Sequence, residues 1–302
     1  MTLMLVCFAA AALGPGEDGV SGDAVIRGGE GGSEVVITTT DRLAGAIHSL
    51  TWGGKEFIDS FDHGRQLQSA ANFDCGKPFV PEVFNPTEAG SRADGTGDSS
   101  SSRLLELHAE GAELRTTVRM AFWLAPGEES LGNPAQNDRV LSDHLVSKRV
   151  RIGEGGDPKV IRYDVVFTVP QGEHHTYAQF EAVTGYMPPE FGAFWRFDAT
   201  TGDLVPLDDG PGEQADPVVL STADGSHAMG VYSPDPSPGY GRFRFEAERV
   251  NKWNCVFRER DPRGVRPGEY AYRMFVLVGT LDDVRRSLVR LHEGDAAGSD
   301  DS

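Results

Sequence analysis

Hydrophobic and polar residues alternate along several stretches of the chain. The clearest alternation sets one row of positions against another: Ile161, Tyr163, Val165, Phe167 and Val169 against Val160, Arg162, Asp164, Val166 and Thr168. A side-chain period of two indicates a β-strand with one buried face. The same pattern returns at 114–122 and 270–278, so we expect a fold built mainly from strands.

The alternating segments, about a dozen in all, are separated by turns rich in Gly, Pro, Asp and Ser. Helical periodicity is scarce between them, which favours an all-β fold, a large antiparallel β-sandwich, over an α/β fold. One helix is predicted from Leu281 to about His292, with Thr280 as N-cap and Asp283 completing a capping box.

The two ends of the chain differ in composition from its centre. Residues 1–13 are apolar and precede Gly14-Pro15-Gly16, as in a secretory signal, although a buried first strand is an alternative. Residues up to 33 are rich in Gly and acidic side chains and predict a flexible arm, and residues 294–302 predict a disordered acidic tail. We therefore expect a secreted or cell-surface protein with a single β-sandwich domain over residues 34–293.

Charge narrows the classes of partner. The net charge of −18 argues against a nucleic-acid or anionic-membrane surface, and the 13-residue apolar segment is too short to span a bilayer. Arginine supplies most of the positive charge. Its planar guanidinium can bind a carboxylate through two parallel hydrogen bonds, which the lysine ammonium cannot. The composition is therefore compatible with acidic sugars, and it leaves the oligomeric state open.

Cysteines and acidic loops give no firm metal or cofactor site. Cys75 and Cys255 remain as a pair if Cys7 leaves with the leader, and either one bridge or two buried thiols would fit. Their spacing predicts no zinc site. No cofactor is predicted, although acidic loops leave a calcium ion possible without specifying its ligands.

A polar cluster, Asp62-His63-Gly64-Arg65-Gln66, follows a strand, a Gly-Gly turn and a second strand. An imidazole, a fixed cation and an amide beside a glycine suit a hydroxyl-rich or carboxylated ligand. We predict a carbohydrate site in which His63 acts in catalysis and Arg65 and Gln66 bind substrate. The alternative for His63 is a turn histidine bonded locally.

Further candidates lie at strand ends and loops. Asn85 presents an amide for binding, and Glu88 is a candidate acid or base, with a turn of no catalytic role as the alternative. Glu88 and Glu259 are the carboxylate pair that a glycosidase would need. Trp195, Tyr240 and Trp253 are candidate substrate contacts, although sandwich cores also use tryptophan.

Three segments together resemble the galactose-mutarotase-like supersandwich superfamily of sugar epimerases, polysaccharide lyases and related enzymes. They are the hairpin GAIHSLTWGGKEFID, the strands VIRYDVVFTVP and TYAQFEAVTGYMP around Gln171-Gly172-Glu173-His174-His175, and Trp253–Glu259 leading into VRPGEYAYRMFVLVGT. The resemblance implies a two-layer antiparallel fold. It also implies His174 or His175 as a proton donor and Glu259 as a base.

The sequence thus predicts an exported carbohydrate-active enzyme that cleaves a poly- or oligosaccharide. A lyase is preferred to a glycoside hydrolase, because His and Arg candidates cluster more clearly than a carboxylate pair. One alternative is a sugar epimerase or mutarotase using a His/Glu acid–base pair. The other is a non-catalytic carbohydrate-binding module.

Overall fold

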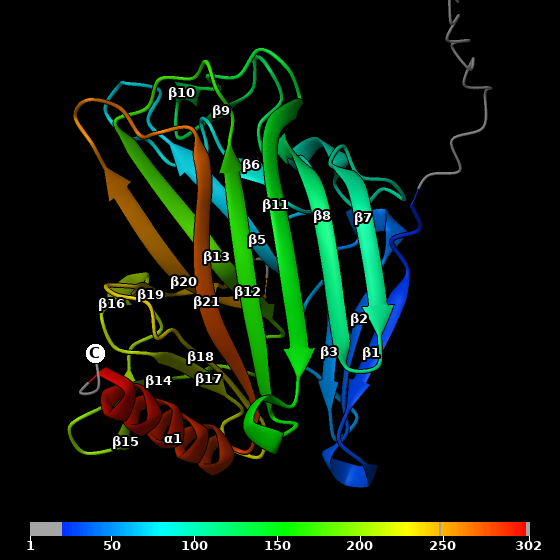
Figure 1. Cartoon of the computed structure of the whole chain (residues 1–302), viewed down its shortest axis with the longest axis vertical. Coiled ribbons are helices and arrows are strands. Elements are labelled where there is room, and N and C mark those ends of the chain that lie inside the picture. The colour runs from blue at the N-terminus through cyan, green and yellow to red at the C-terminus, as the bar shows by residue number, and fades with distance from the viewer. Residues whose placement is uncertain (1–19, 248, 300–302) are drawn as a thin grey trace, which may run out of the picture.

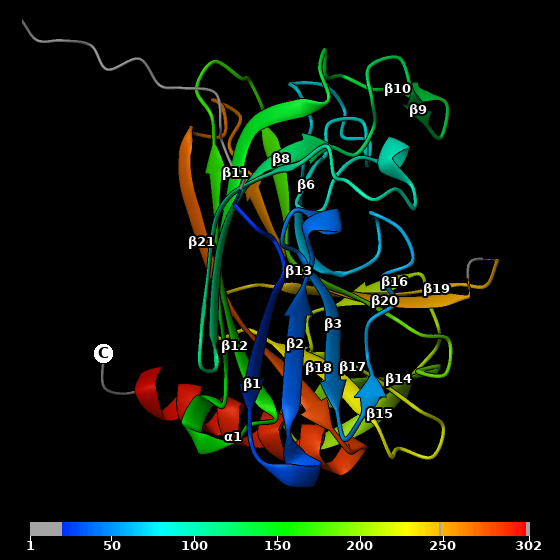
Figure 2. The ribbon, with the colours of Figure 1, turned by 90° about the vertical axis from the view of Figure 1, so that its right-hand side faces the viewer.

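Two layers of antiparallel strands face each other across the protein (Figure 1, Figure 2). This computed structural model describes residues 20–247 and 249–299. In order of pairing, the front layer contains β18 (Ala228–Tyr232), β21 (Gly268–Gly279), β12 (Val160–Val169), β11 (Leu141–Ile152), β8 (Glu113–Phe122) and β7 (Arg103–Glu110). The back layer contains β1 (Ala24–Gly28), β2 (Val35–Thr39), β3 (Ile47–Trp52), β5 (Leu67–Phe73), β13 (Tyr177–Met187), β20 (Val250–Arg260), β19 (Gly239–Phe245) and β16 (Gly212–Gln214).

Short elements complete and connect the layers. The two-residue strand β6 (Pro86–Thr87) pairs with both β5 and β8, so it joins the layers into one sheet. The front layer continues from β18 into β17 (Val218–Ser221), β14 (Ala193–Asp198) and β15 (Asp203–Leu207). The remaining elements are β4 (Lys55–Glu56), the pair β9 (Glu129–Ser130) and β10 (Asn133–Pro134), and the 3-10 helices η1 (Gly31–Ser33), η2 (Asp41–Leu43), η3 (Arg92–Asp94) and η4 (Glu154–Gly156).

The core fills the space between the layers. In β12 the row from Ile161 to Val169 is buried and the alternate row is mostly part-exposed, as its period of two predicts. In β8, alternate residues from Leu114 to Met120 point into the core, and in the second half of β21 Met274, Val276 and Val278 do the same. From the back layer, Phe180, Trp253 and Phe257 meet them in one continuous apolar cluster. The predicted all-β sandwich is therefore confirmed.

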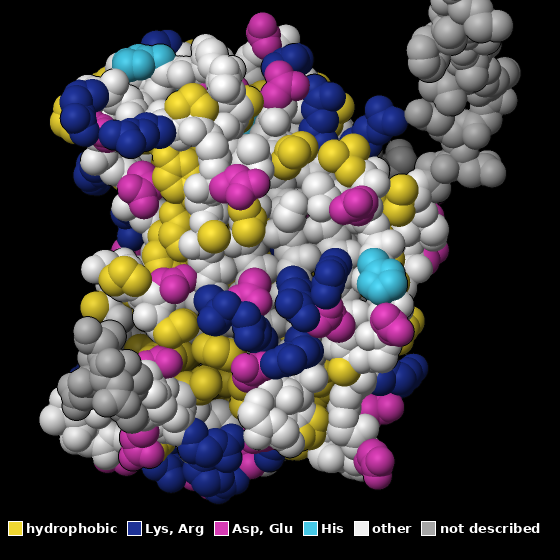
Figure 3. Space-filling model, in the orientation of Figure 1, with side chains coloured by type: hydrophobic (Ala, Val, Ile, Leu, Met, Phe, Trp, Pro, Cys, Tyr) yellow, Lys and Arg dark blue, Asp and Glu magenta, His cyan; other side chains and the backbone are white. Residues whose placement is uncertain are grey.

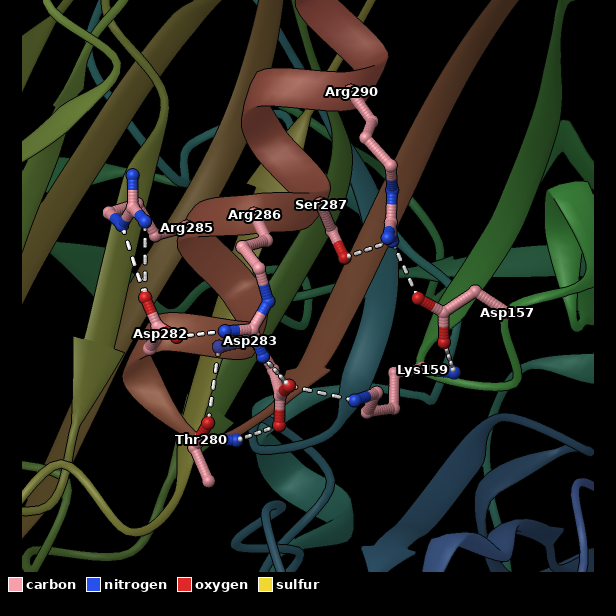
Figure 4. Close-up of polar contacts among 9 residues, drawn as sticks. All are labelled: Asp157, Lys159, Thr280, Asp282, Asp283, Arg285, Arg286, Ser287 and Arg290. Carbon is pink, nitrogen blue, oxygen red and sulfur yellow. Dashed lines mark hydrogen bonds and ion pairs between the residues drawn. The ribbon is translucent and has the colours of Figure 1, made fainter.

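The one α-helix among the described residues, α1 (Leu281–Ser299), covers the outer face of β18 and β21. Val284 and Leu288 pack on Phe275 and Leu277 in a second apolar cluster. The predicted capping box is present: Thr280 Oγ1 accepts from the Asp283 amide at 3.1 Å, and Asp283 accepts from the Thr280 amide at 3.1 Å (Figure 4). Ion pairs Lys159–Asp283 and Arg290–Asp157 fasten the helix to the turn that precedes β12.

The ends of the described chain differ from the predicted boundaries. Residues 24–28, expected in a flexible arm, form β1, because Ile26 buries its side chain and the strand pairs with β2 along its whole length. The helix continues to Ser299, beyond its predicted end near His292. The export-like segment lies outside the described residues, so secretion stays a prediction. None of the described helices combines the length and apolarity needed to cross a membrane.

The exposed face of the front layer carries interleaved charges (Figure 3). Arg149 pairs with Glu113, Arg162 and Arg273 both pair with Asp164, and Arg151 pairs with Glu154. Such exposed pairs contribute little stability individually. They keep this sheet face polar and wet, in contrast to its buried side.

Candidate functional site

A row of polar side chains lies on the outer face of the back layer. Residues directly opposite in an antiparallel pair share a face, and β13 and β20 pair Gln179 with Arg258, Thr184 with Asn254, and Tyr186 with Lys252. We call this outer surface the polar face; it comprises Gln68 and Asn72 of β5, Gln179, Glu181, Thr184 and Tyr186 of β13, Phe243 of β19, and Lys252, Asn254 and Arg258 of β20.

A β-bulge in β13 sets which residues reach the polar face. The pairing with β20 moves from Glu181–Val256 to Val183–Cys255, so β13 advances two residues where β20 advances one. Ala182 and Val183 are both fully buried, and Glu181 and Thr184 lie on the outer side of the bulge. Outward-facing positions are odd-numbered before the bulge and even-numbered after it. Both halves of β13 therefore contribute side chains to the polar face.

The centre of the polar face is an ion pair. Lys252 Nζ lies 3.1 Å from Glu181 Oε2, and the two side chains are only 13% and 14% exposed. The same carboxylate oxygen accepts from Thr184 Oγ1 at 2.9 Å and from Asn254 Nδ2 at 3.3 Å. Charge-assisted hydrogen bonds of this kind hold the four side chains in fixed positions.

The environment fixes the charge of each group. Burial alone would raise the pKa of Glu181, but the Lys252 ammonium and three side-chain hydrogen bonds outweigh it and hold the pKa below its usual range. Burial opposes the charge of Lys252, yet Glu181 and Tyr186 raise its pKa above the ordinary value. Burial raises the pKa of Tyr186. At neutral pH the face therefore offers a carboxylate, an ammonium and a protonated phenol.

Aromatic rings and loops frame this centre. The Lys252 ammonium lies 5.3 Å from the ring centroids of both Tyr186 and Phe243. On the β5 side, loops cover the face: Gln68 donates to the Gly64 carbonyl at 2.9 Å, and Asn72 accepts from the Glu82 amide at 2.9 Å. The accessible part of the polar face therefore runs along β13 and β20.

The predicted cluster at 62–66 lies in a turn with locally satisfied side chains. His63 is 1% exposed, and its ring nitrogens face the carbonyl oxygens of Gly95 and Arg42, each at 2.8 Å. Arg65 lies 3.3 Å from Asp62, and Gln66 is buried and donates to the Asp62 carbonyl. This placement favours the locally bonded turn histidine over a catalytic one.

Asn85 and Glu88 point into the interior. Asn85 Nδ2 donates to the Ala71 carbonyl at 2.6 Å. Glu88 is inaccessible to solvent, forms an ion pair with the equally buried Lys148 of β11, and accepts from the Ser69 amide at 3.0 Å. A carboxylate sealed between the layers cannot meet a substrate, so this position favours a structural role.

The two adjacent histidines separate, as expected of neighbours in an extended segment. His174 is exposed, whereas His175 is 2% exposed and packs on Phe73. His175 Nδ1 accepts from the Cys75 amide at 3.2 Å, so its Nε2 carries the proton and donates to Glu173 at 2.9 Å. His144 Nε2 lies 3.2 Å from the same Glu173 oxygen.

The late-strand candidates lie on the side of β20 opposite the polar face. Glu259 pairs with Ala178, in the row that includes Trp253 and Phe257, and it is exposed at the end of the strand. Trp253 is fully buried against Gly185. Glu259 therefore cannot act together with Glu181, and Trp253 is a core residue.

The two other predicted contacts also have internal partners. Tyr240 is 1% exposed and its hydroxyl accepts from the Ser233 amide at 3.0 Å. Trp195 donates from Nε1 to Ser221 Oγ at 3.0 Å and packs on the cluster beneath α1. The predicted site residues thus do not converge on one groove.

Neither cysteines nor acidic clusters supply a metal centre in the described part of the chain. Cys75 and Cys255 are unpaired thiols, and burial raises the pKa of Cys75 to about 12. No group of three or more His, Cys, Asp or Glu residues among the described residues is arranged to hold a metal ion.

The fold is similar to that of several solved structures. A glycosyl hydrolase family 38 protein from Enterococcus faecalis aligns with a TM-score of 0.52 and 10% identity, over 87% of this chain and 31% of that protein. A candidate aldose 1-epimerase from Escherichia coli K12 aligns at 0.47 and 11%, over 86% of this chain and 100% of that protein. A heparan sulfate lyase from Pedobacter heparinus aligns at 0.43 and 10%, over 86% of this chain and 36% of that protein.

Identities this low describe the fold alone. The chain has the galactose-mutarotase-like sandwich fold that its sequence resembles, as predicted. No protein-family model and no curated protein matches the sequence.

Sequence reasoning missed the residues of the polar face. Glu181 and Tyr186 lie within the strand TYAQFEAVTGYMP, and Lys252 and Asn254 flank Trp253. A charged residue inside an otherwise apolar strand was the available signal, because such a residue needs a partner on a neighbouring strand. Only the pairing of β13 with β20 identifies that partner.

Proposed function

We propose that the protein is carbohydrate-active and that its saccharide lies on the polar face, centred on Glu181 and Lys252. The observation that supports this most is the contact of a carboxylate with an ammonium, a hydroxyl and an amide on neighbouring rigid strands. Sugar hydroxyls both donate and accept hydrogen bonds, so a fixed array of mixed donors and acceptors suits them. The rings of Tyr186 and Phe243 add surface for the C–H faces of a sugar.

The preferred reaction within this proposal is lyase cleavage. A lyase must neutralise a substrate carboxylate, remove the adjacent carbon-bound proton and protonate the leaving oxygen. Lys252 is a cation for the first step, Glu181 an ionised acceptor for the second, and the protonated Tyr186 hydroxyl a donor for the third.

Hydrolysis fits this face less well. A glycoside hydrolase needs a carboxylic acid that stays protonated near neutral pH, opposite a second carboxylate. The pKa of Glu181 is shifted in the other direction, and the neighbouring Glu213 is held by both terminal nitrogens of Arg258. Glu181 is therefore not the protonated acid that the displacement of a hydrolase requires.

The test uses the full chain, a glycan array and three product assays. Lyase action creates unsaturated ends that absorb ultraviolet light, hydrolysis creates reducing ends without that absorbance, and epimerisation changes optical rotation without cleavage. Glu181→Gln and Lys252→Met should each lower binding or turnover at least about tenfold, since each removes one partner of a partly buried charged pair. Glu259→Gln is the matched control, because it changes the same residue type on the opposite side of the sheet.

Each outcome bears on the proposal. Retention of glycans with no product in any assay would identify a binding module and contradict the lyase chemistry. Equal effects of Glu181→Gln and Glu259→Gln would contradict the location of the site.

A further inference from the structure

A hollow of about 440 Å³ lies at the end of the polar face, where β13 begins and β20 ends. Its lining includes Asp74, Lys77, Phe79, Thr176, Tyr177 and Arg260. The hollow thus combines two cations with two aromatic rings. Such a combination is suited to a ligand that has both an anionic group and a C–H surface.

The two cations of the hollow are available to a ligand. Neither Lys77 nor Arg260 forms an ion pair within the described residues, whereas most other lysines and arginines there contact a carboxylate. Lys77 contacts the Gln136 side-chain oxygen, and the Arg260 guanidinium lies 4.4 Å from the Tyr177 ring centroid. In a chain with a net charge of −18, two cations without carboxylate partners in one hollow are unusual.

The single carboxylate in the lining is already satisfied. Asp74 accepts from the Thr176 amide at 2.8 Å, from Thr176 Oγ1, and from the Gly76 amide at 3.1 Å. Burial alone would raise the pKa of Asp74, but these hydrogen bonds lower it. The Asp74 charge is therefore already met by neighbouring N–H and O–H donors, whereas Lys77 and Arg260 are exposed.

The hollow is continuous with the polar face. Tyr177 pairs with Arg260 in the same register in which Gln179 pairs with Arg258, and beyond the bulge Tyr186 pairs with Lys252 on the same face. Arg258 Nε donates to the Tyr177 hydroxyl, which lies 3.2 Å from Gln179 Oε1, so a polar chain links the hollow to the row. From Tyr177 to Tyr186 the strand extends roughly 30 Å, longer than one sugar ring.

We propose that this hollow is a subsite for an anionic sugar unit, carrying a carboxylate or a sulfate group, within an oligosaccharide that also lies on the polar face. The inference rests on the function proposed above and names its substrate class. The Arg260 fork would hold the anionic group by two parallel hydrogen bonds, with Lys77 as a second charge. The rings of Phe79 and Tyr177, 4.6 Å apart and nearly perpendicular, would support the sugar ring.

The test compares polymers that differ only in charge. Binding of the full chain is measured by calorimetry to polygalacturonate and its methyl ester, and to dextran sulfate and dextran. Arg260→Gln and Lys77→Gln should each weaken binding of the anionic polymers roughly ten- to hundredfold and leave neutral polymers unaffected. Arg263→Gln is the control, because Arg263 is exposed, pairs with Asp261 and lies outside the hollow.

The outcomes distinguish a failure of the anionic subsite from a failure of the proposed saccharide site. Preference for polygalacturonate over its ester assigns a carboxylate, and preference for dextran sulfate alone assigns a sulfate. Binding of neutral polymers that depends on Glu181 but not on Arg260, with no gain from charge, overturns the subsite and keeps the proposed function. An equal loss in Arg263→Gln overturns the subsite as a nonspecific charge effect. No binding to any of the four polymers contradicts both.

Discussion

Two carboxylate–ammonium pairs use the same chemistry on opposite sides of the back layer. Glu181 and Lys252 are slightly exposed on the polar face, whereas Glu88 and Lys148 are sealed between the layers. A charge withdrawn from water is tolerated only with a partner, so each pair fixes the strands that carry it. Position alone therefore separates a pair that can contact a ligand from one that cannot.

The interior pair is expected to act on stability alone. Lys148→Met leaves the Glu88 carboxylate buried without its counter-charge and should lower the free energy of unfolding by about 3–5 kcal/mol. Urea denaturation measures this change, and the double variant Glu88→Gln with Lys148→Met should recover much of it. Saccharide binding by folded Lys148→Met should be unchanged; its selective loss would place Glu88 in the site.

The sequence could identify Glu88 as unusual but not its surroundings. Its partner Lys148 lies 60 positions further along the chain, and the burial of both depends on how the two layers stack. The same holds for His63, whose two carbonyl partners come from separate turns. The local sequence identified His63 and Glu88 as polar candidates for a site. It could not show that tertiary packing buries both side chains.

At the scale of elements, close packing between β13 and β20 depends on Gly185. A Cβ atom at this position would lie 2.5 Å from the Trp253 ring. Gly185→Ala should therefore destabilise the protein by about 1–3 kcal/mol through overpacking. Gly32→Ala, where a Cβ meets nothing within 4 Å, is the control in the same urea titration. Equal midpoints for both variants would contradict this account.

Helix α1 depends on its cap. Thr280→Ala removes the hydroxyl that accepts from the Asp283 amide and should lower stability by about 1 kcal/mol. Thr280→Ser keeps that oxygen and should restore most of the loss. Thermal unfolding of the three proteins measures the effect, and a deficit in Thr280→Ser equal to that in Thr280→Ala would exclude capping as its cause.

The strands and the helix were predictable because their signals are local. Alternation in β8, β12 and β21 and the capping box of α1 can each be recognised within about a dozen residues. The strand β1 was missed because its five residues, AVIRG, sit in a glycine-rich stretch and contribute one fully buried side chain. Its pairing with β2 stabilises it, and that contact is not local.

At the scale of the whole molecule, acid should destabilise the fold before its carboxylates titrate. Burial lowers the pKa of His144 to about 4, so the unfolded chain takes up a proton first as the pH falls. This contribution is fully present above about pH 6.5 and is lost progressively down to pH 4, on the order of 3 kcal/mol. His48, whose pKa burial also lowers, acts in the same direction.

Urea midpoints between pH 7.5 and 4.5 test this expectation. His144→Phe, which suits the surrounding Phe73, Phe84 and Phe122 rings, should flatten the pH dependence over this range. The carboxylates Asp74 and Glu181, whose folded pKa values are lowered, add acid sensitivity only below about pH 4.5. An unchanged slope in the variant would assign the acid sensitivity to other groups.

The polar face itself was beyond local prediction because four strands build it. Its members come from β5, β13, β19 and β20; about a hundred positions separate β5 from β13, and about fifty separate β13 from β19, which β20 follows directly. The family resemblance predicted the fold and a saccharide site, but it assigned Glu259, which register places on the other side of the sheet. Successive residues of a strand lie on alternate sides of the sheet, so a residue's position along the strand decides its side. One inserted residue exchanges the sides of all residues that follow it.

Ala182, the extra residue at the bulge, therefore determines on which side of the sheet the later residues of β13 lie. Without the extra residue, everything in β13 beyond Glu181 would exchange sides: Tyr186 and Thr184 would turn toward the Trp253 ring, and Gly185 would turn toward the solvent. A lineage that lost this one codon would keep every side chain of the surface yet dismantle it.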